Sequence, residues 1–160
     1  MIMTIEVLEN YMENIISDIR DELANKGIND TKKASNSLRF QITVTAESYV
    51  GEIYAADHLE FTNKGRGAGK IPKRNLNIIE NWVRRKLGLT DEREIATATY
   101  FIRKKIREKG TNIFLDNSKG IQLEKIIEKN KQYLIENVKK SVKFAVKEEL
   151  NKYFKLKFNE

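Results

Sequence analysis

The chain has 160 residues with 30 basic and 23 acidic side chains, and its formal net charge is +7. This length fits one ordinary domain spanning residues 1–160, with a real core, and is too short for two. The absence of cysteine excludes disulfides and thiolate metal sites, and the single histidine, His58, removes most histidine-based catalysis and metal binding.

No apolar run approaches the roughly 18 residues that a membrane span needs. The first residues of the chain are acidic where a signal peptide would be basic. We therefore expect a soluble protein that is not secreted.

The charge is distributed unevenly along the chain. Residues 1–63 carry 5 basic and 11 acidic side chains, residues 64–86 carry 8 and 1, and residues 87–160 carry 17 and 11. The middle segment alone therefore has an excess of +7, equal to that of the whole chain. Such asymmetry suits nucleic acid, and it equally suits a subunit whose basic face meets the acidic face of a copy of itself or of another protein.

Apolar residues three or four apart predict an amphipathic helix over residues 4–26, ended by Gly27. Residues 28–37 are polar and without periodicity, which is typical of a loop. Strict alternation over residues 38–46 predicts a half-buried strand, and residues 48–54 are rich in β-branched and aromatic side chains. Because one short turn separates these two runs, we expect them to form a hairpin.

Two further helices are predicted after the hairpin. Pro72, the only proline, stands just ahead of a helix over residues 76–87, and Gly88 closes that helix. Thr90 and the two acids after it are a suitable start for the next helix, which leads to Gly110.

The last third of the chain is predicted to hold one short strand and one long helix. The strand is expected at residues 112–115, and the helix at residues 121–154 with a break near Asn130. Together these elements predict an α+β fold, with helices on one face of a small antiparallel sheet.

Most of the functional information lies in residues 54–89, where an aromatic and acidic patch leads into a glycine-rich basic loop. Three glycines in five residues free the backbone for a close approach to a partner. The run GRGAGK is not a P-loop, because Gly65 and Gly69 are one residue too close and Ile71 replaces the magnesium-binding hydroxyl. We expect a mobile contact loop for a neighbouring subunit or for DNA, formed by Lys64, Gly65, Arg66, Gly67, Gly69, Lys70, Lys73 and Arg74.

His58, with Asp57 and Glu60 beside it, has two interpretations. It fits an acid–base pair or a metal site, or it is a structural or interface histidine. The second is favoured, because the sequence offers no orienting third group and no second cluster of such residues.

Trp82 with Arg84, Arg85 and Lys86 has the mixture of aromatic and cation that nucleic-acid binders use. Because Trp82 falls on the apolar face of its helix, we expect it in the core, and Arg84 and Arg85 on a solvated or interfacial face. The N-terminal helix has an acidic outer face that complements the basic loop, made of Glu6, Glu9, Glu13, Asp18, Asp21 and Glu22.

Three runs carry a family resemblance: YAADHLEF at 54–61, GRGAGKIP at 65–72 and IENWVRRK at 79–86. They resemble the tail-completion or neck proteins of tailed bacteriophages, closest to those of phages that infect Bacteroidota, including crAss-like phages. In that family the second helix closes on a phrase like IRKKIREKGT, which here is 102–111. The resemblance covers roughly residues 36 to 111, and it departs from the pattern at Ala68 and Lys73, where proline is expected.

The resemblance implies a non-enzymatic virion structural protein that forms a homo-oligomeric ring of six or twelve copies around the DNA channel, in the head-to-tail connector or tail. It implies no catalytic residue, cofactor or metal, and no membrane. The implied partners are portal, neck or other tail proteins, with non-specific contact to genomic DNA. Assembly would take place in the host cytoplasm.

In a ring every interface is head-to-tail, so two different patches must be complementary. The basic loop and the acidic helix face offer two such patches. The alternative is a nucleic-acid-binding module in which the same loop, with Arg84, Arg85 and Lys86, contacts phosphates. A small enzyme is a third and weaker hypothesis, since no nucleophile–base–orienter set is present.

Overall fold

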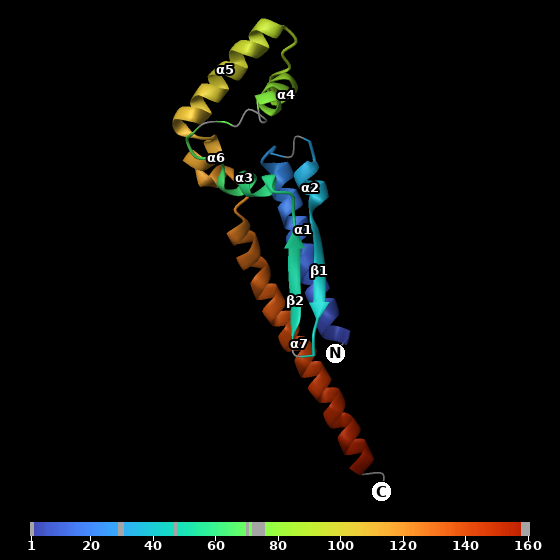
Figure 1. The fold of residues 1–160 in the computed structure, drawn as a ribbon. Helices are drawn as coiled ribbons and strands as arrows, with labels where there is room; N and C mark the ends of the chain where they lie inside the picture. Colours follow the sequence, from blue (N-terminus) through green and yellow to red (C-terminus); the bar gives the residue numbers. More distant parts are fainter. Residues whose placement is uncertain (1, 29–30, 47, 70, 72–75, 158–160) are drawn as a thin grey trace. The chain divides into compact units, whose positions relative to one another are not determined.

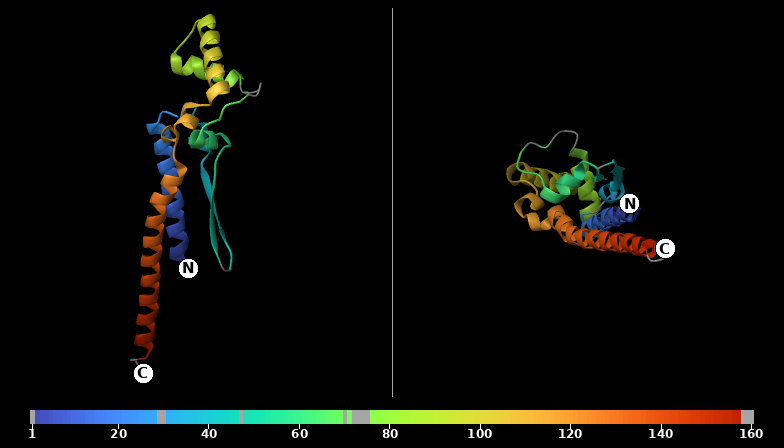
Figure 2. Two further views of the ribbon diagram at one scale, coloured as in Figure 1. Left: turned by 90° about the vertical axis from the view of Figure 1, so that its left-hand side faces the viewer. Right: turned by 90° about the horizontal axis from the view of Figure 1, so that it is seen from below.

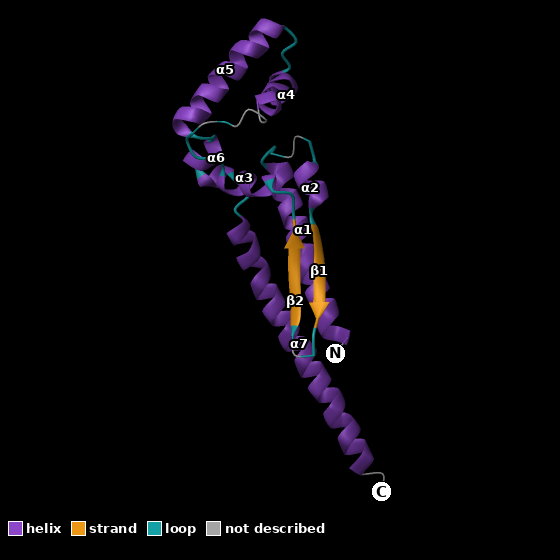
Figure 3. Ribbon diagram, viewed as in Figure 1, coloured by secondary structure: helices purple, strands orange, loops and turns teal. Residues whose placement is uncertain are grey.

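The computed structural model describes residues 2–28, 31–46, 48–69, 71 and 76–157. It is mixed α+β, as predicted, with several helices and one antiparallel hairpin (Figures 1 and 3). The chain divides into two compact units, and each is described by itself. Unit 1 comprises Met1–Ala56 and Leu123–Glu160, and unit 2 comprises Asp57–Gln122. The single domain expected from chain length stays a prediction.

Unit 1 has three layers, with α1 (Ile2–Asn25) between the hairpin and α7 (Leu123–Lys157), as Figure 2 shows. The hairpin pairs β1 (Arg39–Val44) with β2 (Tyr49–Tyr54). The core of unit 1 is built mainly by α1, whose buried side chains recur every three or four residues, as an amphipathic helix requires. They are Met12, Ile15, Ile16, Ile19 and Leu23.

The hairpin turns alternate residues towards α1. Phe40 lies opposite Ile53 on this inner face, and Ile42 lies opposite Gly51. A Cβ at Gly51 would overlap the terminal methyl group of Met12 in α1. Glycine at this position therefore gives the end of the Met12 side chain its place against the hairpin, and a residue with a Cβ would require that flexible side chain to move.

Two local predictions in unit 1 are wrong. The segment expected to be a loop contains a short helix, α2 (Lys33–Ser37), in which Ala34 is buried. The helix expected to break near Asn130 runs without interruption from Leu123 to Lys157. Asn130 is only 6% exposed, and its side-chain amide donates to Asp18 of α1 at 2.8 Å and to the Ile126 carbonyl at 2.9 Å.

Unit 2 is built from α3 (His58–Lys64), α4 (Leu76–Leu87), α5 (Glu92–Lys109), α6 (Asn112–Leu115) and a 3-10 turn, η2 (Asn117–Lys119). Helices α4 and α5 pack together, and Val83 and Ile95 are fully buried on them. Trp82 is 40% exposed, so its predicted place in the core is wrong, and the neighbouring Val83 takes the buried position.

The strand predicted at residues 112–115 is also wrong, because these residues form the single turn α6. Thr111 precedes this turn as its N-cap, and its hydroxyl oxygen accepts a hydrogen bond from the Phe114 backbone N–H. An N-cap of this kind satisfies a helix donor that has no partner inside the helix.

Candidate functional site

The glycine loop, residues 65–69 of unit 2, is tied to the end of α5 and the start of α6. The Arg66 backbone N–H donates to Thr111 Oγ1 at 2.9 Å, and the Thr111 N–H donates to the Arg66 carbonyl at 2.8 Å. The Gly69 N–H donates to the Arg107 carbonyl at 3.0 Å. Residues 65–69 therefore form a loop held by hydrogen bonds at its base, whereas the sequence predicts a mobile contact loop.

Glycine is required in this region because backbone segments meet there. Gly65 has φ of +72°, and a Cβ at this residue would overlap the Phe114 backbone nitrogen. Gly110 has φ of +88°, and a Cβ there would lie 2.6 Å from the Arg66 carbonyl oxygen. Both positions combine a left-handed backbone with a close approach, which only glycine allows.

The exposed part of the loop is its apex. Ala68 and Gly69 are exposed, whereas Gly65, Arg66 and Gly67 are half-buried. Lys64, at the end of α3, is exposed and lies 3.9 Å from Glu60, a distance that marks a weak ion pair. The other three predicted contact residues, Lys70, Lys73 and Arg74, lie outside the described residues.

The acidic residues predicted on the first helix divide into two groups. Asp18 accepts hydrogen bonds from Lys129 at 3.0 Å and from Asn130 at 2.8 Å, both on α7, and Glu22 pairs with Lys26 at 3.1 Å. Partial burial raises the pKa of Asp18, but the hydrogen bonds from α7 outweigh that effect and leave the pKa below its ordinary value. The remaining members of the predicted acidic face are exposed: Glu6, Glu9, Glu13 and Asp21.

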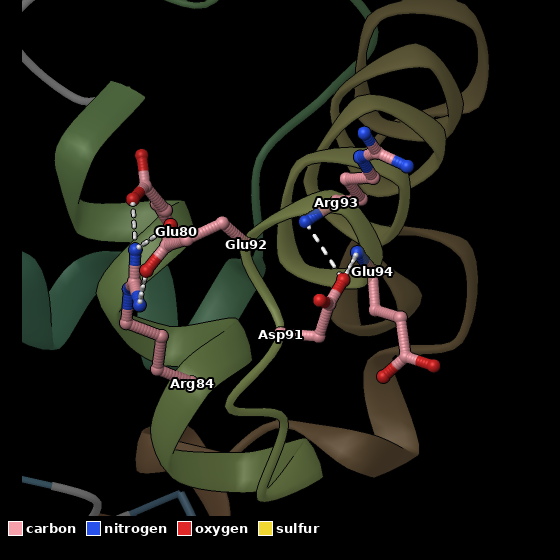
Figure 4. Close-up of polar contacts among 6 residues, drawn as sticks. All are labelled: Glu80, Arg84, Asp91, Glu92, Arg93 and Glu94. Carbon is pink, nitrogen blue, oxygen red and sulfur yellow. Dashed lines mark hydrogen bonds and ion pairs between the residues drawn. The ribbon is translucent and has the colours of Figure 1, made fainter.

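Arg84 joins α4 to the start of α5 (Figure 4). Its guanidinium donates to both oxygens of Glu92, at 2.8 and 2.7 Å, and to Glu80 at 2.9 Å. The hydrogen bond from Arg84 lowers the pKa of Glu92, and the same bond raises the pKa of Arg84. A guanidinium held by two carboxylates is a structural clamp, so Arg84 is a poor candidate for the phosphate contact considered above.

The outer side of α5 carries a group of residues that we did not predict. Tyr100 is 59% exposed, and cations stand three, four and seven residues from it, so all lie on one side of the helix. We call this group the basic helix face: Arg93, Tyr100, Arg103, Lys104 and Arg107. The sequence does contain a pattern that could have predicted this face, namely cations at helical spacing around a tyrosine. We interpreted the helix from its apolar periodicity and did not recognise that pattern.

His58 begins α3 and is exposed. In the described part of the chain, no three His, Asp or Glu side chains are grouped so that they would hold a metal ion. Across the same residues, none of the helices has the length and apolar character needed to cross a membrane.

Comparison with known protein families, with curated proteins and with solved structures finds no match. The functional argument therefore depends on the residues of this chain and on their arrangement.

Proposed function

We propose that the protein is a non-enzymatic structural component of a bacteriophage virion, which forms a homo-oligomeric ring around the DNA channel in the head-to-tail connector or tail. One observation carries the proposal. Two segments on which the family resemblance depends, residues 65–69 and 102–111, are hydrogen-bonded to each other through Arg66, Thr111, Gly69 and Arg107. The shared residues thus build a single feature, a stapled loop with an exposed apex.

Such a loop is suited to contact between subunits. Because its base is held by three hydrogen bonds, two between backbone groups and one to the Thr111 hydroxyl, its apex is presented with little loss of conformational entropy on binding. The exposed Lys64 supplies positive charge beside the apex, and the exposed acids of α1 offer a patch of opposite charge on a second copy: Glu6, Glu9, Glu13 and Asp21. A contact between two different patches is head-to-tail, and it closes into a ring when the rotation between copies allows.

The proposal is tested by the oligomeric state of the purified protein and by electron microscopy of virions. Ala68→Glu places a negative charge at the loop apex without touching its hydrogen bonds, and Ala68→Lys is its matched control of opposite charge. Ala55→Glu adds the same negative charge at an exposed position of unit 1. We expect rings from the unchanged protein, from Ala68→Lys and from Ala55→Glu, and predominantly monomers from Ala68→Glu, because like charges at an interface oppose association.

A protein that stays monomeric, together with virions that show no ring of this chain, would refute the proposal. If Ala68→Glu forms rings as well as the unchanged protein does, the proposal of a ring stands, but the loop apex is not part of the interface between subunits.

The second candidate function is a nucleic-acid-binding module. The observation in its favour is that unit 2 holds 15 basic and 8 acidic side chains, an excess of +7, whereas unit 1 holds 15 of each. Binding of this kind weakens steeply with added salt. A mobility shift at low salt from a protein that stays monomeric would favour the module over the ring, and the absence of any shift at low salt would count against it.

A further inference from the structure

The cations of the basic helix face lack acidic partners in the structure. Among the described residues, no carboxylate forms an ion pair with Arg93, Arg103, Lys104 or Arg107. All four share one side of an 18-residue helix, so their charges add rather than cancel.

Four carboxylates of unit 2 are engaged by groups other than the basic helix face. Glu80 and Glu92 hold Arg84, and Asp91 caps α5 by accepting from two backbone N–H groups (Figure 4). Asp116 accepts from the Ser118 backbone and hydroxyl beside η2. The other two acids of α5, Glu94 and Glu108, are exposed and form no ion pair with the basic helix face among the described residues. With six cations and three acids, α5 therefore keeps an excess of positive charge.

The type of cation also differs between the two units. Unit 2 contains seven of the nine arginines of the chain, whereas α7 carries ten lysines and no arginine. Lysine is a strongly hydrated point charge, while the planar guanidinium of arginine binds phosphate oxygens in a two-pronged geometry. The lysines of α7 therefore fit a solvated face, and the arginines of α5 fit phosphate recognition.

We propose that the basic helix face binds the phosphate backbone of duplex DNA without reading its sequence. At 1.5 Å per residue, Arg93 and Arg107 lie about 21 Å apart along α5. A DNA strand presents about six phosphates over that length. Tyr100 lies between these cations, and a tyrosine hydroxyl is a usual donor to phosphate oxygen. The location in a DNA channel rests on the proposed function, whereas the binding itself needs no ring.

The test compares two triple variants that remove the same charge from different helices. The first, Arg103→Gln with Lys104→Gln and Arg107→Gln, neutralises the basic helix face. The control replaces three exposed lysines of α7 by glutamine: Lys139, Lys140 and Lys143. Glutamine keeps helix propensity close to that of the original residues, and circular dichroism checks that both proteins remain helical.

Binding is measured by fluorescence anisotropy with a duplex of roughly 30 base pairs of mixed sequence, over a series of salt concentrations. For the α5 triple variant, we expect the slope of log K against log salt to become shallower by about 2.7, since each phosphate contact contributes about 0.9. The α7 control should keep the slope of the unchanged protein. The single exposed variant Lys104→Gln should lose about 0.9 of the slope and serves if the triple variant unfolds.

Equal slopes for the α5 variant and the unchanged protein would overturn the inference, and so would equal losses in both triple variants. Loss of oligomers with unchanged DNA binding would show that the face contacts an acidic protein surface instead. Mass photometry on the same samples separates the two proposals. If the protein is a monomer and the α5 variant loses DNA binding, the proposed ring is refuted and this inference stands. If the protein forms rings and the α5 variant binds DNA as the unchanged protein does, this inference is refuted and the ring stands.

Discussion

Replacing Thr111 by alanine should loosen the glycine loop and destabilise unit 2. The hydroxyl accepts from the part-buried Arg66 N–H at 2.9 Å and from the Phe114 N–H at 3.4 Å. Leaving a buried backbone N–H unpaired costs about 1–3 kcal/mol, and we take the lower half of that range because the group is only partly buried. Loss of a long N-cap bond adds about 0.5 kcal/mol. The free energy of unfolding should therefore fall by about 2 kcal/mol.

Trp82 provides the measurement, because it is the only tryptophan and belongs to unit 2. With a urea m-value of about 2 kcal/mol per molar, the fluorescence midpoint of Thr111→Ala should move down by about 1 M. Thr111→Ser keeps the hydroxyl and should stay within about 0.3 M of the unchanged protein. The reasoning is refuted if alanine and serine give the same midpoint, since the two differ at this site mainly in the hydroxyl.

Two further predictions concern close packing and pH. Gly120→Ala should lower the stability of unit 2 by about 1–3 kcal/mol in the same assay, because its Cβ would overlap the Asn63 carbonyl. The same change at Gly88 meets no atom within 4 Å and tests the effect of positive φ alone. Because the pKa of Asp18 is lowered on folding, the stability it adds is present above its ordinary pKa of 3.8 and is lost as the pH falls through the folded pKa. Melting temperatures of the unchanged protein and Asp18→Asn should therefore converge towards pH 3, and a constant difference from pH 7 to pH 3 would contradict the lowered pKa of Asp18.

Periodicity alone located the longer elements. The helices α1, α4 and α5 begin and end within about two residues of their predicted bounds, a normal scatter for helix ends. Gly27, Gly88 and Gly110 follow these helices with positive φ, so the predicted ends have a structural cause. The first strand of the hairpin was predicted by alternation, which is the signal of a sheet with one covered face, and the second by its β-branched and aromatic residues one short turn later.

The predictions that failed depend on contacts between distant parts of the sequence. Residues 112–115 form a helical turn because Thr111 is fixed by the glycine loop, 45 residues earlier, and caps the turn. Asparagine has a low helix propensity, so Asn130 suggested a helix break, but Asp18, 112 residues away, accepts a hydrogen bond from its side-chain amide. Local propensity contains no information about either partner, so tertiary contacts decide both cases.

The sequence located the glycine loop correctly, but the role predicted for its glycines was incomplete. We attributed its glycines to freedom of the backbone for contact with a partner. Gly65, and Gly110 at the end of α5, combine a positive φ with a close approach between backbone segments of unit 2 itself. That difference alters where contact residues should be sought. The base of the loop is occupied by unit 2 itself, and only the apex around Ala68 remains exposed among its described residues.

The distribution of charge along the sequence also gave only part of the answer. Residues 64–86 hold an excess of +7, and so does the whole of unit 2, so the sequence located the basic part of the molecule but not its free cations. Within that segment Arg84 is held by two carboxylates. On α5 one of the two acids in the first turn, Glu92, serves that clamp, and Arg93, Arg103 and Arg107 form no ion pair among the described residues. A run of like charges therefore identifies the basic unit, and the ion pairs formed on folding determine which face of it can bind a polyanion.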